Sequence, residues 1–167
     1  RSLLGVIPDS HLLEYAPIAS ALELHANALN GLMERRAPKP DITPQQLRDR
    51  SWWSGPQFFV IIDDYELVST SSGNPLAVLT ENLPFARDVG MRFIIARNSA
   101  GASRSMFESF MQRVKELGAQ GMVLSGDPAE GDVFGGVRPR PMPPGRGFFV
   151  SRKRGVPLTQ VGWLPEQ

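Results

Sequence analysis

Residues 58–64, FFVIIDD, give the clearest indication of the fold class. Aromatic and β-branched residues follow one another from Phe58 to Ile62 without alternation, which is typical of a strand buried on both faces of a parallel sheet. The run ends abruptly in Asp63 and Asp64. Open α/β sheets bind ligands outside the carboxyl ends of their strands, so this acidic end is a candidate ligand site.

The segments around this strand alternate between helical and strand patterns. Apolar residues at intervals of three and four predict helices over residues 18–36, 76–89 and 106–117, and Thr43 before Pro44 predicts a short capped helix over 44–50. Short apolar runs predict strands over 91–96, 121–124, 148–151 and 158–163, and the tail of another at 2–7. A loop rich in Pro, Gly and Arg occupies 132–147. Two strands joined by a helix form a parallel βαβ unit, so the expected fold class is α/β.

Composition restricts the function classes. The 167 residues are about the size of one domain, and 41% apolar with 21% charged residues fits a globular protein with a core. The absence of cysteine excludes disulfide and thiolate chemistry, and His11 and His25 have no carboxylate at a zinc-binding spacing. No run approaches the ~18 apolar residues of a membrane span. The chain starts at Arg1 in the middle of a pattern, as though cut from a longer one.

The acidic strand end has the form of a Walker B motif. Asp63 would hold a magnesium ion through water, and Asp64 would orient an attacking water. Acids after a buried strand can also simply cap the following turn, and that alternative stays open. Asn98, after the second strand, is a candidate sensor of the γ-phosphate, or equally the first residue of an ordinary turn.

The phosphate-binding loop G-x-x-x-x-G-K-[ST] is absent. None of the three lysines, Lys39, Lys115 and Lys153, follows a glycine. Because backbone amides and a lysine in that loop neutralise the phosphates, this chain is not expected to hydrolyse ATP alone or to hold a cofactor tightly.

Basic residues gather toward the C-terminus. No acid occurs between Asp132 and Glu166, whereas Arg138, Arg140, Arg146, Arg152, Lys153 and Arg154 do. Such a cluster could bind phosphates or an acidic protein surface, or could be a solvated loop. Aromatic residues are not interleaved as a stacking platform for bases would require, so nucleic acid is not an expected partner.

Ordered motifs along the chain resemble the C-terminal ATPase domain of the EccC family, the FtsK/SpoIIIE-type ATPases of mycobacterial type VII (ESX) secretion. They are SLLGVIPDSHLLE from Ser2, WWSGP from Trp52, FFVIIDDYELV from Phe58, GASR from Gly101, LSGDPAEG from Leu124 and GGVRPRPMPPGRG from Gly135. The resemblance covers essentially the whole chain, and its specificity comes from the number of motifs in order.

The resemblance implies a RecA-like P-loop NTPase fold, with residues 1–167 as the C-terminal portion of one such domain and the phosphate loop missing. It further implies ATP and magnesium in the full domain, and a hexameric, membrane-anchored motor at the cytosolic face that exports WXG-type proteins. Partners would be upstream ATPase domains, other secretion subunits and the C-terminal signal of the substrates. Two departures bear on hydrolysis: the acid pair is Asp-Asp where efficient hydrolases have Asp-Glu, and residues 119–124 lack the arginine of related motors.

Two alternative functions remain open from the sequence: a DNA-translocating motor domain of the FtsK type, and a RecA-like interaction domain without a nucleotide site. If the chain acts in type VII secretion, an amphipathic export signal needs an apolar groove with a charged rim on its surface. The helix at 18–36 and the Trp52-Trp53 turn are predicted to supply the walls, and the arginines near Arg138 the rim. The alternative is that the apolar residues of this helix are core.

Overall fold

The computed structural model describes residues 7–105 and 107–162. The predicted strands at 58–62 and 91–96 are present as β1 (Phe58–Ile62) and β2 (Met91–Ile95), which pair in parallel with Ile62 opposite Ile95. The parallel pairing confirms the α/β class. The expected strand tail at 2–7 lies almost entirely outside the described residues.

Two of the predicted helices are confirmed nearly to the residue. Helix α1 runs from Ala19 to Arg36 and α2 from Pro44 to Asp49. Thr43 caps α2 through a reciprocal capping box, in which its hydroxyl accepts from the Gln46 amide and the Gln46 side chain accepts from the Thr43 amide. Helix α2 ends at Arg50, which adopts the left-handed conformation with φ of 52°.

The predicted helix at 76–89 is wrong. Two 3-10 helices, η1 (Pro75–Leu79) and η2 (Leu83–Phe85), replace it. Pro84 lacks the N–H that an α-helix would need there, and its ring would clash with the preceding turn. The four apolar residues of the pattern, Leu76, Leu79, Leu83 and Ala86, are nevertheless all buried, so the sequence identified the buried face although it misjudged the helix type.

The third predicted helix is shorter than expected. Helix α5 runs from Ser109 to Glu116, because Glu108 is extended and caps it by accepting from the amides of Phe110 and Met111. Two further short helices, α3 (Tyr65–Val68) and α4 (Ala102–Ser105), follow β1 and β2.

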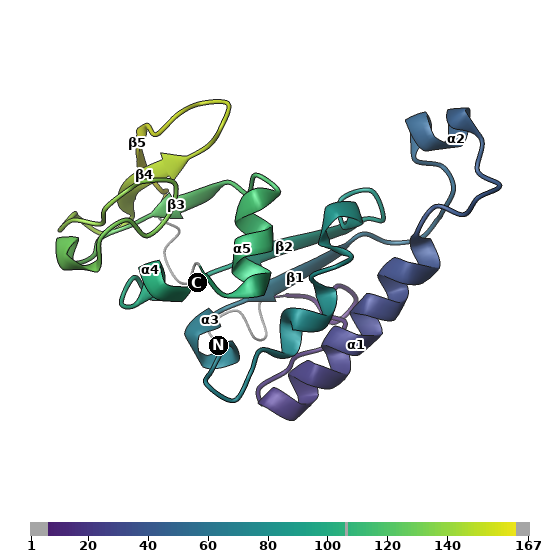
Figure 1. Ribbon diagram of the computed structural model, residues 1–167, viewed down its shortest axis with the longest axis horizontal. Helices are drawn as coiled ribbons and strands as arrows, with labels where there is room; N and C mark the ends of the chain where they lie inside the picture. The colour runs from purple at the N-terminus through teal and green to yellow at the C-terminus, as the bar shows by residue number, and fades with distance from the viewer. Residues whose placement is uncertain (1–6, 106, 163–167) are drawn as a thin grey trace.

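One hydrophobic core joins the helices to a single face of the parallel strands. Its buried members come from α1, β1, α3, η1, η2, β2 and α5 and from the turn before β2, and they include Met33, Ile62, Tyr65, Leu79 and Phe110. Figure 1 shows α1 running diagonally beneath β1 and β2, with α5 close to the same strands. The helices and strands are thereby locked into one unit.

The opposite face of these strands is exposed, which contradicts the prediction that β1 is buried on both faces. Phe59 is 62% and Ile61 53% exposed, and Ile94, which pairs with Ile61, is also exposed. The described residues place no element over this face, so β1 alternates between buried and exposed positions.

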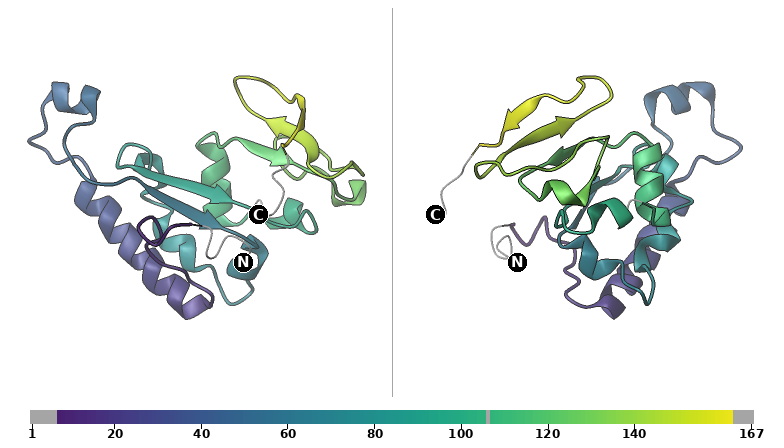
Figure 2. Two further views of the ribbon diagram at one scale, coloured as in Figure 1. Left: turned by 180° about the vertical axis from the view of Figure 1, so that it is seen from behind. Right: turned by 60° about the vertical axis from the view of Figure 1, so that its left-hand side comes forward.

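The C-terminal third forms a separate antiparallel sheet. The strands β3 (Gly121–Val123), β4 (Arg146–Val150) and β5 (Leu158–Gln160) pair in that order, so the predicted third strand does not join β2 within the described residues. Between β3 and β4 lie the 3-10 helix η3 (Pro128–Glu130) and a long loop, whose valines 133 and 137 form a small core with Val123. Both views in Figure 2 show this sheet at the end of the molecule opposite α2.

Candidate functional site

The two acids of the Walker B pattern lie at the carboxyl edge of the parallel strands. Both Asp63 and Asp64 are exposed, and the Asp64 amide donates to the Asp63 carboxylate at 3.1 Å. Asp64 has φ of 51°, a left-handed conformation that short polar side chains tolerate. This turn points the chain from β1 into α3.

Asn98 lies at the same edge, after β2. Two backbone bonds fix the neighbouring strand ends, from the Ala96 amide to the Ile62 carbonyl at 2.8 Å and from the Tyr65 amide to the Ala96 carbonyl at 3.0 Å. The side-chain oxygen of Asn98 accepts from the Ala100 amide at 2.9 Å, which is the ordinary turn that the sequence left open as the alternative. The sensor role of Asn98 stays a prediction.

Glu66 is a residue of this edge that sequence reasoning missed. Its carboxylate oxygens lie 3.2 and 3.3 Å from the Asn98 amide nitrogen, so α3 is tied to the loop after β2. An acid in the first turn of a short helix gives no sequence signal that its partner lies 32 residues away.

The donor set at this edge fits a magnesium ion held mainly by water and phosphate. Within 7–105 and 107–162 no three His, Cys, Asp or Glu side chains converge as a metal cage. Magnesium usually keeps several waters and takes one or two carboxylates, with the remaining ligands from the substrate's phosphates. Asp63 and Asp64 meet that requirement for carboxylates, whereas the phosphate-cradling loop is not in the chain.

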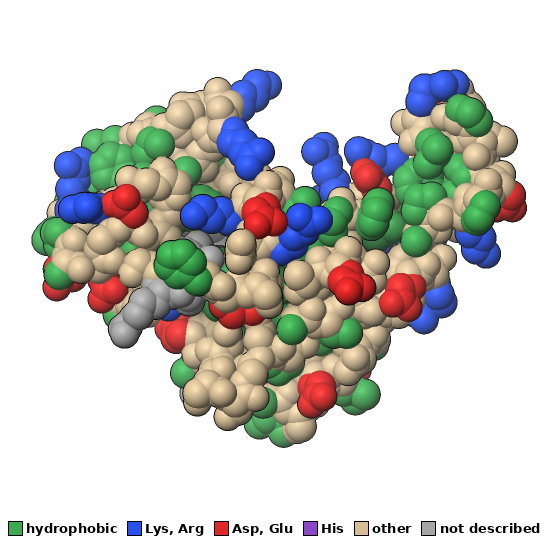
Figure 3. Space-filling view, viewed as in Figure 1, with side chains coloured by type: hydrophobic (Ala, Val, Ile, Leu, Met, Phe, Trp, Pro, Cys, Tyr) green, Lys and Arg blue, Asp and Glu red, His purple; other side chains and the backbone are tan. Residues whose placement is uncertain are grey.

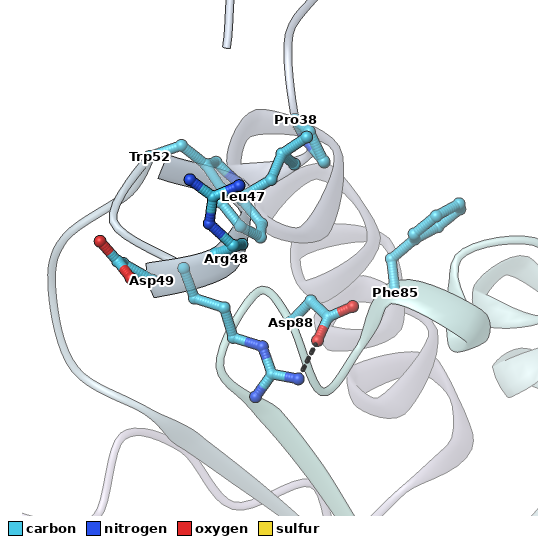
Figure 4. A pocket seen from close by; sticks show the side chains of 8 residues that line it. Pro38, Leu47, Arg48, Asp49, Trp52, Phe85 and Asp88 are labelled. Carbon is cyan, nitrogen blue, oxygen red and sulfur yellow. Dashed lines mark ion pairs between the residues drawn. The ribbon is translucent and has the colours of Figure 1, made fainter. Parts of the chain in front are cut away.

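A second candidate site is a cleft beneath α2, which we call the α2 cleft. It encloses about 520 Å³ and is lined by Pro38, Leu47, Arg48, Asp49, Arg50, Trp52, Phe85 and Asp88. That volume lies in the range of ordinary ligand sites. Figure 4 shows Leu47 and Trp52 on one side and Phe85 on the other. Leu47 and Phe85 are both about half exposed, so the apolar walls are accessible to a ligand.

Charged groups stand around these walls. Arg50 donates to Asp88 at 2.9 Å, which bridges the end of α2 to the turn after η2. Arg48 donates to the side-chain oxygen of Gln45 at 2.6 Å, and none of the ion pairs within the described chain includes it. In Figure 3 apolar side chains gather beneath α2, with basic groups above and beside them. Asp49 and Asp88 also line the cleft, so charges of both signs surround its apolar walls.

The cleft corrects the predicted groove in two respects. Trp52 does line it, but the apolar residues of α1, among them Leu29, Leu32 and Met33, pack into the core, as the alternative from sequence had it. Arg138 is not its rim: it pairs with Asp132 at 2.9 Å and lines a different hollow, with Pro139 and Phe148, at the far end of the molecule. The arginines that line this cleft are Arg48 and Arg50.

The parallel strands with their helices on one face and the acidic carboxyl edge define an α/β domain, and the solved structures that it matches place it in the RecA-like P-loop class. No protein-family model matches the chain. It is 46% identical over 165 residues to the ESX-4 secretion system protein EccC4 of Mycobacterium tuberculosis, and 47% identical over 163 residues to the ESX secretion system protein EccC of Thermomonospora curvata. The alignments cover 99% and 98% of this chain, which spans 13% and 12% of the length of these relatives.

Two solved structures of Thermomonospora curvata EccC agree with the sequence comparison. The cytoplasmic domain superposes with a TM-score of 0.93 over 99% of this chain and 19% of its own, at 46% identity. ATPases 2 and 3 of that protein, in complex with a signal sequence peptide, superpose with a TM-score of 0.92 over 99% of this chain and 30% of their own, also at 46% identity. The chain belongs to the EccC family of type VII secretion ATPases, as its motifs indicated.

Within residues 7–105 and 107–162, no helix has both the length and the apolar character needed to cross a bilayer.

Proposed function

We propose that this chain is the substrate-recognising part of a nucleotide-dependent ATPase domain in a type VII secretion motor. The observation that carries the proposal is the α2 cleft, an accessible hollow with apolar walls and charged groups of both signs, among which Arg48 belongs to none of the ion pairs of the described chain. A 46% identical structure was solved in complex with a signal sequence peptide, which supports the same class of ligand here. The motor would stand at the cytosolic face of the membrane as a hexamer, with further ATPase domains and secretion subunits as partners.

The geometry of the cleft suits the C-terminal signal of a WXG-type substrate. A helical or extended signal would insert an apolar side chain between Leu47 and Phe85. Arg48, which no carboxylate pairs within the described chain, would then attract an acidic side chain or the terminal carboxylate of the peptide. Apolar contact would supply most of the affinity, and the charge would set the orientation.

A charged substitution in the cleft tests this role. Leu47→Glu is expected to weaken binding of a fluorescent C-terminal peptide of a WXG-type substrate at least roughly tenfold, because the apolar wall becomes a carboxylate beside the peptide's own acid. Leu24→Glu is the matched control, since Leu24 is an exposed leucine on α1 away from the cleft. Fluorescence anisotropy measures both variants.

Two results would count against the docking role. The first is equal affinity of the Leu47→Glu and Leu24→Glu variants. The second is binding of the peptide only to upstream domains of the parent motor, with affinity unchanged when residues 1–167 are removed.

The nucleotide site is proposed to be completed by sequence that this chain does not contain. Asp63 would hold magnesium through water and Asp64 would orient the attacking water, with Asn98 beside them. Bound magnesium would neutralise the charge that develops on the phosphates. The Asp-Asp pair favours a domain in which ATP binding regulates export more than ATP hydrolysis drives it.

A binding measurement checks whether the nucleotide site needs sequence that this chain does not contain. The 167-residue chain is expected to bind ATP weakly or not at all in calorimetry with magnesium, because it has no phosphate loop. Tight, magnesium-dependent binding would contradict the proposal. If a longer parent chain with an intact phosphate loop also failed to bind, the alternative of a RecA-like interaction domain would replace it.

A further inference from the structure

Arg36, the last residue of α1, is buried and contacts Trp52, one of the residues that line the α2 cleft. It is only 9% exposed, and its Nη1 donates to the carbonyl oxygens of Pro56 at 3.0 Å and Val89 at 3.1 Å. These carbonyls belong to the segments that run on either side of the cleft, one from α2 to β1 and the other from η2 to β2. One guanidinium therefore joins two stretches of chain that are far apart in sequence.

Both tryptophans of the turn after α2 contact this residue, Trp52 at its backbone carbonyl and Trp53 at its side chain. The Trp52 indole donates to the Arg36 carbonyl oxygen at 2.7 Å, and the Arg36 guanidinium lies 4.3 Å from the centroid of the Trp53 ring. The Phe58 ring lies on the guanidinium as well, at 5.2 Å. Cation–π contacts of this kind strengthen when the cation is desolvated.

Trp53 links Arg36 to the turn at 85–88, which forms the other wall of the cleft. Its indole donates to the Asp88 carbonyl oxygen at 2.7 Å, and the Asp88 carboxylate accepts from Arg50. Gly90 permits the close approach: it has φ of +78°, and a Cβ there would lie 2.3 Å from the Trp53 ring. The Trp53 ring therefore packs against the turn that contains Phe85 and Asp88. Trp53 itself does not line the cleft.

The arrangement is specific to arginine. Burial lowers the pKa of the Arg36 guanidinium, yet arginine remains charged at neutral pH. No carboxylate pairs with it within residues 7–105 and 107–162, so two carbonyls and two aromatic rings offset its desolvation. A planar guanidinium can stack on a ring while one of its nitrogens donates to two carbonyls, whereas a lysine ammonium has no plane to stack.

We propose that Arg36 is a positioning residue for the α2 cleft, which holds Trp52 and the turn at 85–88 at the spacing that a bound peptide requires. Its side chain acts through Trp53 and through the carbonyls of Pro56, in the segment that carries Trp52, and Val89, next to Asp88, and it does not line the cleft itself. The inference rests on the proposed function of the cleft as a peptide site. Binding sites lose affinity when the supporting residues no longer fix the walls.

The test compares Arg36→Lys with Arg35→Lys in the 167-residue chain. Arg35 is the preceding residue of the same helix and is exposed, so its replacement removes the same chemical group without touching the cleft supports. Arg36→Lys is expected to weaken binding of the C-terminal WXG-type peptide roughly tenfold at a temperature where circular dichroism shows the variant fully folded. Arg35→Lys is expected to leave the affinity within about twofold of the parent.

A second variant and a second readout keep the outcome clear. Trp53→Phe removes the indole hydrogen bond to the Asp88 carbonyl and leaves every residue that lines the cleft unchanged. This variant is also expected to bind the peptide more weakly than the parent chain does. In chains labelled with 5-fluorotryptophan, the resonance of Trp52 should shift in Arg36→Lys and stay in place in Arg35→Lys. Parent-like affinity in folded Arg36→Lys and Trp53→Phe, or an unmoved Trp52 resonance, would overturn the positioning role. Failure of the parent chain itself to bind the peptide would instead overturn the proposed function, while the Trp52 resonance would still decide the role of Arg36.

Discussion

Replacing Phe110 with alanine is expected to lower the free energy of unfolding by about 3–5 kcal/mol. Phe110 is 0% exposed and lies where α5 meets the rest of the core. Its ring stacks on Tyr65 with centroids 6.2 Å apart and meets Phe93 edge-on at 6.0 Å. The substitution removes both contacts and leaves a cavity between α5 and the strands. Since domains are stable by only about 5–15 kcal/mol, a loss of this size would leave the chain close to unfolding.

The matched control for this loss is Phe107→Ala. Phe107 lies three residues earlier in the same segment and is 83% exposed, so its removal should change the stability by no more than about 0.5 kcal/mol. Urea denaturation followed by circular dichroism measures both variants. Similar losses for Phe107 and Phe110 would show that α5 does not pack on the strands as described.

Local patterns predicted those elements whose causes are local. The bounds of β1 follow from five consecutive apolar residues, and α2 follows from the Thr43 cap and Pro44. By contrast, the apolar periodicity at 76–89 predicted an α-helix, but Pro84 cannot occupy the interior of one. The segment therefore forms two 3-10 helices. The exposed face of β1 was unpredictable for another reason, since burial depends on which elements cover a strand and not on its own residues.

The α2 cleft shows where sequence reasoning stops. Its walls come from Pro38, from Leu47 to Trp52 and from the turn at Phe85 to Asp88, which nothing in the sequence brings together. The sequence did single out Trp52 as an apolar wall, but it assigned the rim to Arg138 because arginines are dense there. In the proposed function the charge comes instead from Arg48, in the short helix α2. Arg36 gave even less signal, since a basic residue in the last turn of a helix ordinarily complements the helix dipole.

Glu108 shows the same limit in the core, where one carboxylate accepts several hydrogen bonds. It accepts from the Tyr65 hydroxyl and from the amides of Phe110 and Met111 at 3.1 and 3.2 Å. Asn74 donates to the Tyr65 hydroxyl at 2.8 Å, so Tyr65, the loop before η1 and α5 meet at this group. In the sequence, the acid reads only as an unremarkable residue inside a helical pattern.

The charge of Glu108 is stabilised in the folded chain. Burial acts to raise the pKa of this carboxyl, but the hydrogen bonds from Tyr65, Asn74 and the amides of Phe110 and Met111 outweigh burial and leave the pKa lowered. Burial and the neighbouring carboxylate together raise the pKa of Tyr65, which therefore stays a neutral donor. A carboxyl with a depressed folded pKa contributes stability that is complete above its unfolded pKa of ~4.3 and is lost as the pH falls through the folded pKa.

Glu108→Gln is therefore expected to lower the free energy of unfolding by about 1–3 kcal/mol at pH 7. The difference between parent and variant is expected to become smaller as the pH falls below about 4. The amide keeps one acceptor oxygen, but it loses the charge and places a donor among the donors of Tyr65 and the α5 amides. Urea denaturation of the parent and the variant at several pH values between 7 and 3 measures the difference directly. Glu81→Gln is the control, because Glu81 is exposed and its substitution should give a small difference at every pH. A loss from Glu108→Gln that stays constant down to pH 3 would show that the shape of the side chain, and not its charge, holds α5 to Tyr65.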